Sequence, residues 1–409
     1  MNLIDIGMAM ASTFALHNGD RVVFYGDSIT EQRHYTTFAE AFVRTRYPNL
    51  DVRFFSRGWG GDASWGGGGG TIEQRVSQDV ASLKPTMISV LLGMNDGGYV
   101  PYDPKIATTF DEWYGKLLDL FRKAAPGARF TCIETCPWDE YAHQLAAGPP
   151  KDGAWEPWDG YNEVLVHYAD VVKKQAAEAG ATFVDFNEPL VAVLKAARVA
   201  NPALAKEIIP DSIHPGPAGS LVMAGALVQA WGFRPVMSSV QIDSRASIAT
   251  CENTKVTNLN GLSWDQLDAS LPLPLAPEAP TDMLAWKVSG LQELINSSLV
   301  KIDGLGAGQY RLTIDKKPMV SHSAEEWASG IDIGSGITPM REQALKVLEL
   351  VQQRSDLDFF RWRTLQREHS NLKASSDAIK ALDRMEEELF EAERKTAQPV
   401  RRHFELKKV

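Results

Sequence analysis

A few short polar segments of this sequence carry side chains that could together cleave an ester. Ser28 follows the apolar run Val22–Tyr25, and Asp211 and His214 lie three residues apart just past the middle of the chain. A serine hydroxyl becomes a nucleophile when a histidine takes its proton and a carboxylate orients that histidine. We therefore predict Ser28 as the nucleophile, His214 as the general base and Asp211 as the group that orients it.

Three further groups could stabilise the negative charge that this chemistry places on a carbonyl oxygen. The backbone N–H of Ser28 lies where a predicted strand turns into a helix, and Gly61 and Asn95 follow the next two predicted strands. A glycine N–H without a side chain in the way and an amide side chain can both donate to an oxyanion. We predict that these three groups form the oxyanion hole, with Gly60 as the alternative to Gly61.

Aromatic residues gather on two long loops, residues 58–70 and 137–161, which follow the second and fourth predicted strands. Aromatic rings beside a reactive serine suit the binding of sugar rings. The alternative is that large loops need tryptophans to stay ordered. The residues predicted to bind substrate are Trp59, Trp65, Trp138, Trp155 and Trp158.

The part of the chain that contains these groups alternates short apolar segments with helical patterns. This alternation is typical of βαβ units that build a parallel sheet covered on both faces. The loops after such strands meet at one edge of the sheet, where open α/β proteins bind their ligands. The predicted strands are Val22–Tyr25, Val52–Phe55, Met87–Leu92, Phe130–Glu134 and Thr182–Phe186.

The polar segments resemble the sequence blocks of the SGNH (GDSL-type) hydrolases and occur in the same order. The resemblance implies a flavodoxin-like three-layer α/β/α sandwich with a five-stranded parallel sheet. It also implies a serine esterase with a Ser-His-Asp triad, and neither a metal ion nor an organic cofactor. Ser56 departs from the family, because asparagine is common at that position. The segments that carry the resemblance are Gly26–Thr30, Gly61–Asp62, Gly93–Asp96 and Asp211–Pro215.

Other charged residues near these segments have ordinary structural explanations. Asp27, Asp62 and Asp96 are expected to hold the turns in which they lie, since aspartate accepts hydrogen bonds from nearby backbone N–H groups. Arg75 and Asp79 are four residues apart on a predicted helix. That spacing predicts a surface ion pair of little energetic value.

The alternation of short strands and helical patterns ends near residue 240. We predict a catalytic domain over residues 1–238, a small β-rich accessory domain over 239–330 and a helical segment over 331–409. Residues 300–312 predict a β-hairpin. The helices must bury their apolar faces on the catalytic domain or in a dimer interface, and the second case predicts a homo-oligomer. This part resembles the long C-terminal extension of a subgroup of bacterial SGNH proteins.

Composition narrows the choice of partners. The formal net charge of −10 argues against nucleic acid or an anionic membrane as the main ligand. No apolar run is long enough to span a bilayer. Residues 6–16 are weakly apolar and are either the remnant of a trimmed signal peptide or a simple lead-in. The first case predicts a periplasmic or secreted protein and the second a cytoplasmic one.

Together these features predict a serine esterase that removes a small acyl group, most simply acetyl, from a carbohydrate through an acyl-enzyme. The partner is then a small-molecule or glycan ester. A lipid or thioester hydrolase with the same mechanism is one alternative. A carbohydrate-binding or scaffold protein on the same frame is another, and ester turnover distinguishes it from an enzyme.

Overall fold

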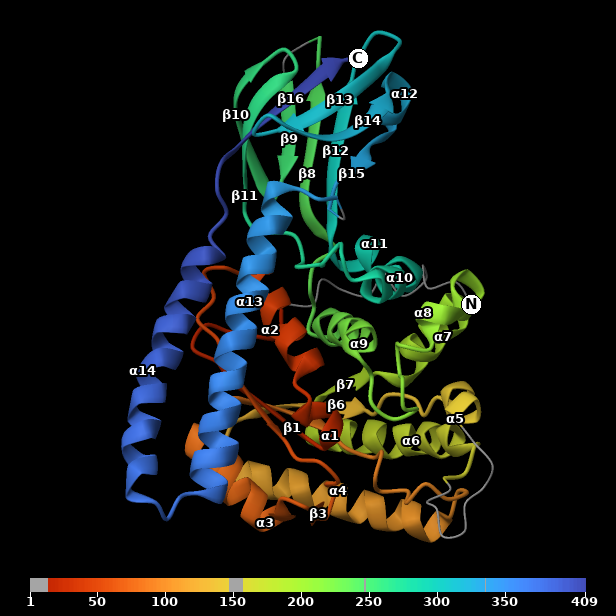
Figure 1. The fold of residues 1–409 in the computed structure, drawn as a ribbon, viewed down its shortest axis with the longest axis vertical. Coiled ribbons are helices and arrows are strands. Elements are labelled where there is room, and N and C mark those ends of the chain that lie inside the picture. The colour runs from red at the N-terminus through yellow and green to blue at the C-terminus, as the bar shows by residue number, and fades with distance from the viewer. Residues whose placement is uncertain (1–13, 147–156, 246–247, 335) are drawn as a thin grey trace.

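The computed structural model describes residues 14–146, 157–245, 248–334 and 336–409. An α/β unit forms the lower part of the molecule in Figure 1, and two antiparallel or mixed β-sheets form the upper part. The long helices α13 (Pro339–Phe359) and α14 (Lys373–Thr396) run down one side of the α/β unit (Figure 1). No helix within the described part of the chain is long and apolar enough to cross a membrane.

The α/β unit is built on a five-stranded parallel sheet with the order β2-β1-β5-β6-β7. Its central strands are apolar and almost fully buried, as strands covered on both faces must be. The fold class and the strands predicted for this part are thereby confirmed. The strands are β1 (Arg21–Gly26), β2 (Arg53–Gly58), β5 (Met87–Leu91), β6 (Arg129–Glu134) and β7 (Thr182–Asp185).

Helices cover both faces of this sheet and complete three layers. On one face α2 and α7 pack against α9, and on the other α4 packs against α6. Local signals start several of them: Pro104 and Pro217 stand at the first helical position of α4 and α9, where proline costs no hydrogen bond. The helices are α2 (His34–Arg46), α4 (Pro104–Ala124), α6 (Tyr161–Ala179), α7 (Asn187–Ala200) and α9 (Pro217–Ala230). Shorter helical segments are α1 (Ser28–Glu31), α3 (Ile72–Arg75), η2 (Val76–Val80), η3 (Ala81–Leu83), α5 (Glu140–Ala146) and α8 (Pro202–Ala205).

The upper part contains two further sheets, with the orders β10-β11-β16-β13-β14 and β15-β12-β8-β9. Strand β8 spans the boundary predicted at residue 238, and the predicted domain division stays a prediction. The strands are β8 (Val236–Asp243), β9 (Ile248–Glu252), β10 (Thr254–Asn260), β11 (Ser263–Asp268), β12 (Ser297–Asp303), β13 (Gln309–Ile314), β14 (Lys317–Ser323), β15 (Ile331–Asp332) and β16 (Arg402–Lys408). Helices α10 (Pro280–Ser289), α11 (Leu291–Ile295) and α12 (Ala324–Ser329) accompany them, and the short ribbon of β3 (Gly66–Gly67) and β4 (Gly70–Thr71) belongs to the α/β unit.

The hairpin predicted over residues 300–312 is wrong. Strand β12 pairs in parallel with β8 in one sheet, whereas β13 pairs with β14 and β16 in the other. The tight turn of this region is instead Asp315-Lys316 between β13 and β14, where both residues have positive φ. Such a two-residue turn with left-handed residues matches the twist of the strands that it joins. Local pattern alone could not tell a hairpin from a crossover between two sheets.

The chain does not end in a helix as its pattern predicted. Strand β16 lies between β11 and β13 and is antiparallel to both. Phe404 and Leu406 are buried, and Phe404 stacks on Trp264 with 5.4 Å between ring centroids. The alternation of buried and exposed side chains over so few residues is a weak signal beside a long helix. The two long helices thus connect the α/β unit to a strand at the far end of the molecule.

The helical segment is anchored to the α/β unit by buried ion pairs. Helix α13 packs on α2 and lies beside the edge strand β2. Arg354 pairs with Glu40 of α2 and with Glu393 of α14, and Asp358 makes a bidentate pair with Arg57 of β2 at 2.6 and 2.8 Å. Removing one member of such a pair leaves an uncompensated buried charge. Helix α13 and the α/β unit therefore form one continuous structure.

Candidate active site

The proposed nucleophile lies at the turn between β1 and the single-turn helix α1. Asp27 caps this helix, since its carboxylate accepts a hydrogen bond of 2.9 Å from the N–H of Ile29. Ser28 is the first helical residue and is half-buried, with its backbone N–H among those that have no partner inside the helix. Burial raises the pKa of the Asp27 carboxyl to about 7. Asp27 therefore holds the turn that carries Ser28, as the sequence predicted.

The structure brings Ser28, His214 and Asp211 into one hydrogen-bonded relay. The Nε2 atom of His214 is 2.8 Å from Ser28 Oγ, and its Nδ1 atom is 2.7 Å from Asp211 Oδ2. The other oxygen of Asp211 accepts the backbone N–H groups of Ile213 and His214. This geometry fixes the imidazole tautomer that can accept a proton from the serine.

The charges of this relay support each other. The hydrogen bond that the His214 ring donates to Asp211 raises the pKa of His214, and burial acts in the opposite direction. Burial also opposes ionisation of Asp211, but the hydrogen bonds from the His214 ring and backbone N–H lower the pKa of this carboxyl to about 2. Asp211 is therefore a carboxylate near neutral pH, and His214 is a stronger base than an isolated histidine.

The turn that carries this pair is held in an unusual backbone conformation. Ser212 has a φ of 73°, in the left-handed region that non-glycine residues rarely occupy. Its carbonyl oxygen accepts a hydrogen bond of 2.9 Å from the N–H of Asp139, and Arg198 pairs with the Asp139 carboxylate. Strain of this kind persists only where the surroundings hold it. Sequence reasoning missed Asp139 and Arg198, which carry no motif of their own.

The amide of Asn95 is oriented by two partners. Its Nδ2 atom donates to the carbonyl oxygen of Asp62 at 2.9 Å, and its Oδ1 atom accepts from the Tyr99 hydroxyl at 3.0 Å. An amide nitrogen carries two N–H groups, so one donor is left for an oxyanion. Tyr99 was not predicted, although it follows the Asn95 block by only four residues and has a φ of 60°.

Contacts just after β2 favour one of the two glycines predicted as oxyanion donor. Gly60 donates its N–H to the Glu31 carboxylate at 2.8 Å, which favours Gly61 over Gly60 as the oxyanion donor. Gly61 has a φ of 75°, a conformation that glycine adopts without strain. At Gly58 a Cβ atom would lie 2.1 Å from the backbone nitrogen of Glu31, so only glycine lets β2 approach α1 this closely. Register places these segments together, because Gly26 pairs with Gly58 on one side and Leu91 on the other.

The prediction that Arg75 and Asp79 form a surface pair is wrong. Both side chains are fully buried, and Arg75 donates to Asp62 at 2.8 Å, to Asp79, and to the carbonyl of Arg57 at 2.7 Å. Trp362 from the distant C-terminal segment donates to Asp79 at 2.8 Å. Spacing along a helix cannot reveal a cover supplied by another part of the chain. The glycine loop therefore rests on a buried charge network.

Two of the predicted substrate-binding tryptophans are used for packing. The guanidinium of Arg363 lies 3.2 Å from the ring centroid of Trp59. Trp138 is only 2% exposed, and its ring contacts Tyr99 edge to face at 5.8 Å. Trp138 is buried and Trp59 is partly buried under Arg363, which agrees with the alternative that such loops need tryptophans for order.

The remaining tryptophans differ in their exposure. Trp65 is 39% exposed on the glycine loop. Trp158 is partly buried, and its backbone N–H donates to the carbonyl of Tyr99 at 2.9 Å. Trp155 falls outside the described residues. Among the described tryptophans that were predicted to bind substrate, Trp65 is therefore the exposed one, and its role stays a prediction.

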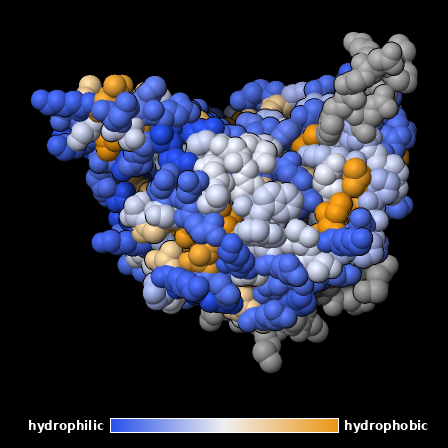
Figure 2. Space-filling view, turned by 90° about the horizontal axis from the view of Figure 1, so that it is seen from below, coloured by the Kyte–Doolittle hydropathy of each residue, from blue (hydrophilic) through white to orange (hydrophobic). Residues whose placement is uncertain are grey.

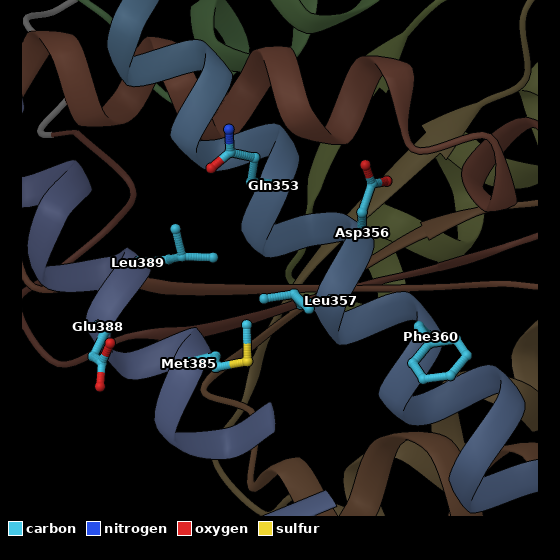
Figure 3. A pocket seen from close by; sticks show the side chains of 7 residues that line it. All are labelled: Gln353, Asp356, Leu357, Phe360, Met385, Glu388 and Leu389. Atoms are coloured by element: carbon cyan, nitrogen blue, oxygen red, sulfur yellow. The ribbon is translucent and has the colours of Figure 1, made fainter. Parts of the chain in front are cut away.

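Cavities occur near segments that carry the relay and also far from it. A cavity of about 310 Å³ is lined by Gln32 and Pro217, close in sequence to Ser28 and His214, and by Gln352 of α13. The largest cavity described, about 680 Å³, lies between α13 and α14 instead (Figure 3). There Leu357 points towards Met385 and Leu389 of the facing helix. Among the described residues no group of three or more His, Cys, Asp or Glu is placed to hold a metal ion.

Comparison with known proteins gives four findings. The model of the GDSL-like Lipase/Acylhydrolase family matches residues 24–221. An acetylxylan esterase of Geobacillus stearothermophilus is 25% identical over 243 residues, which cover 54% of this chain and 98% of that protein. The solved structure of a gut microbial diltiazem-metabolizing enzyme is 25% identical, with a TM-score of 0.79, and covers 96% of this chain and 98% of that one. The crystal structure of an acetylxylan esterase from Geobacillus stearothermophilus covers 54% of this chain and 97% of its own, at 21% identity and a TM-score of 0.42.

Proposed function

Since the chain belongs to the GDSL-like lipase and acylhydrolase family and is a carboxylic ester hydrolase, we propose that it removes acetyl groups from a carbohydrate. We propose Ser28, His214 and Asp211 as its catalytic triad. The observation that carries this proposal is the unbroken relay of 2.8 and 2.7 Å from the serine hydroxyl to the carboxylate.

The reaction proceeds in two halves. Ser28 Oγ attacks the ester carbonyl carbon while its proton passes to His214 Nε2. The tetrahedral intermediate then expels the alcohol oxygen, which takes that proton, and leaves an acetyl group on the serine. Water attacks this acyl-enzyme with His214 as base, and acetate leaves as the proton returns to Ser28. Asp211 stabilises the imidazolium in both halves.

The oxyanion of each intermediate is bound by fixed donors. In this mechanism they are the backbone N–H groups of Ser28 and Gly61 and the second N–H of Asn95. Donors that are already oriented stabilise the charge without reorganisation at the moment of reaction. The hydrogen bonds from Asn95 to Asp62 and from Tyr99 to Asn95 supply this orientation.

Two observations support an acetyl ester of a carbohydrate as substrate. The curated relative is an acetylxylan esterase. The cavity lined by Pro217, which is close in sequence to His214, also carries polar side chains such as Gln32, His34 and Gln352. The face of the molecule seen from below in Figure 2 carries scattered apolar groups separated by hydrophilic ones.

The test compares hydrolysis of p-nitrophenyl acetate, butyrate and octanoate with release of acetate from an acetylated xylo-oligosaccharide. Replacing Ser28 by alanine should lower kcat/KM by roughly 10⁴- to 10⁶-fold, because the nucleophile is lost. Ser263 is a matched control, since it also lies within hydrogen-bond distance of a histidine but far from this site in the sequence. Ser263→Ala should retain wild-type activity.

Two results would contradict the proposal. Ester hydrolysis that persists in Ser28→Ala would refute the proposed catalytic triad. Faster hydrolysis of the octanoate than of both acetyl substrates would move the substrate class to lipids.

A further inference from the structure

The C-terminal segment reaches the glycine loop beside Ser28 through one short element. This element is the π-helical segment η4 (Phe360–Glu368), which continues α13 at the lower end of the molecule (Figure 1). Its Arg363 covers the ring of Trp59 at 3.2 Å from the centroid. The same guanidinium forms an ion pair of 3.5 Å with Glu31, at the end of α1. Residues more than three hundred positions apart thus meet beside the nucleophile.

Glu31 links this contact to the proposed oxyanion hole. While Oε1 faces Arg363, Oε2 accepts the N–H of Gly60 at 2.8 Å. Gly60 is itself close to the nucleophile, because a Cβ atom on it would lie 4.0 Å from the Cβ atom of Ser28. A carboxylate this near to a developing oxyanion would oppose its formation, unless a positive charge offsets it.

Other contacts of η4 hold the far end of the same loop. Arg367 donates to the carbonyl of Gly69 at 2.7 Å and to Asp79 at 2.6 Å. Trp362 is buried and donates to the same Asp79 carboxylate. Segment η4 therefore contacts both the start and the end of the loop that contains Gly61. Helical segments of this kind are frequent at functional sites.

We propose that Arg363 is a positioning residue for ester hydrolysis. It holds Trp59 and Glu31, and through them the peptide units of Gly60 and Gly61, and it offsets the negative charge of Glu31 beside the oxyanion. This inference rests on the proposed function and gives the C-terminal segment a part in the active site. Loss of Arg363 should therefore lower kcat and leave KM nearly unchanged, because the effect acts on the oxyanion and not on the bound ester.

The first experiment replaces Arg363 by alanine, with Arg361→Ala as control. Arg361 lies on the same segment but pairs with Asp383 and Glu386 of α14. With p-nitrophenyl acetate, Arg363→Ala should lower kcat roughly 10- to 100-fold, as small displacements of catalytic groups do. KM should change by less than about threefold, and Tm should match that of the control.

A second pair of variants separates positioning from a merely structural role. Lysine in place of Arg363 keeps the charge, so Arg363→Lys should be more active than Arg363→Ala. In the double variant Glu31→Gln/Arg363→Ala the uncompensated charge is gone, and glutamine can still accept the N–H of Gly60. Its kcat should be several-fold higher than that of Arg363→Ala alone.

The inference is overturned if Arg363→Ala is as active as Arg361→Ala, or if the double variant shows the product of two independent losses. Wild-type protein that hydrolyses no ester would instead refute the proposed function. In that case hydrogen exchange over residues 58–70 decides the positioning role. Faster exchange in Arg363→Ala but not in Arg361→Ala supports it, and equal exchange in both refutes it.

Discussion

A second serine–histidine–aspartate arrangement lies in the upper sheets and can be compared with the relay at Ser28. There the Ser263 hydroxyl is 3.3 Å from His403 Nε2, and His403 Nδ1 is 2.8 Å from Asp265. The corresponding distances at Ser28 are 2.8 and 2.7 Å. By residue type and order of contacts the two sets are alike, so their surroundings must distinguish them.

The backbone around the two serines differs most. Ser28 begins a helix, where N–H groups have no partner within the helix, and neighbouring strand ends bring Gly61 and Asn95 to the same edge of the sheet. Ser263 lies in β11, whose backbone is paired with β10 on one side and β16 on the other. Ser263 is the first residue of a paired strand and not of a helix, so it lacks the run of unpartnered N–H groups that a helix N-terminus offers.

Solvent access differs as well. The side chain of His403 is 49% exposed, against 27% for His214. A solvated histidine hydrogen-bonds to water as readily as to a neighbouring hydroxyl. The comparison teaches that the same three residue types can be in contact at two places that differ in the means of stabilising an oxyanion.

After the serines themselves, the largest expected difference between the two sets concerns the aspartates. Asp211→Asn should lower kcat roughly 10³- to 10⁴-fold, because the imidazole then loses the partner that selects its tautomer. The matched change Asp265→Asn should leave kcat unchanged. Steady-state kinetics with p-nitrophenyl acetate measures both, and an equal loss in the two variants would break the comparison.

Asn95→Ala should cost roughly 10²- to 10³-fold in kcat, since it removes one oxyanion donor and leaves the relay intact. The rate of covalent labelling of Ser28 by a fluorophosphonate should fall with it. Full activity in Asn95→Ala would mean that another group stabilises the oxyanion. The comparison would then lose its main physical explanation.

The smallest effect is the dependence on pH. Because His214 must be neutral to act as base and its pKa is raised by Asp211, kcat/KM should fall about tenfold per pH unit below that pKa. Proton NMR titration of the imidazole should show the midpoint above about 6.5, and Asp211→Asn should move it down. The sign for stability is opposite: a pKa raised by folding stabilises the fold below about 6.5, and that stabilisation is lost as pH rises through the folded pKa. A midpoint unchanged by Asp211→Asn would refute this account.

Much of the fold followed from local patterns. Buried parallel strands are short apolar runs, and the five in the α/β unit were predicted for that reason. The hairpin over residues 300–312 failed because a strand segment carries no mark of the sheet to which it belongs. Strand β16 was missed because it follows a long helical pattern and pairs with strands far away in the sequence. Sheet membership is a long-range property.

The candidate site shows the same division. Asp211 and His214 lie in one turn, so their spacing already allowed the contact that the structure contains. The prediction for Arg75 failed because its partner Asp62 and its cover Trp362 come from other elements. The sequence pattern predicts a free aromatic surface at Trp59, whereas in the structure Arg363 lies over its ring.

By itself the sequence determined which reactive groups are present. They are a serine after a strand, a histidine with its aspartate, and hydrogen-bond donors after the next strands, all at the ends of strands that form one sheet. Each of these depends on a few adjacent residues. Tertiary structure decided what surrounds them, including the orientation of Asn95 by Tyr99 and the cover of η4 on the glycine loop. Burial and charge compensation depend on which distant segments pack together, and only the folded chain brings those segments into contact.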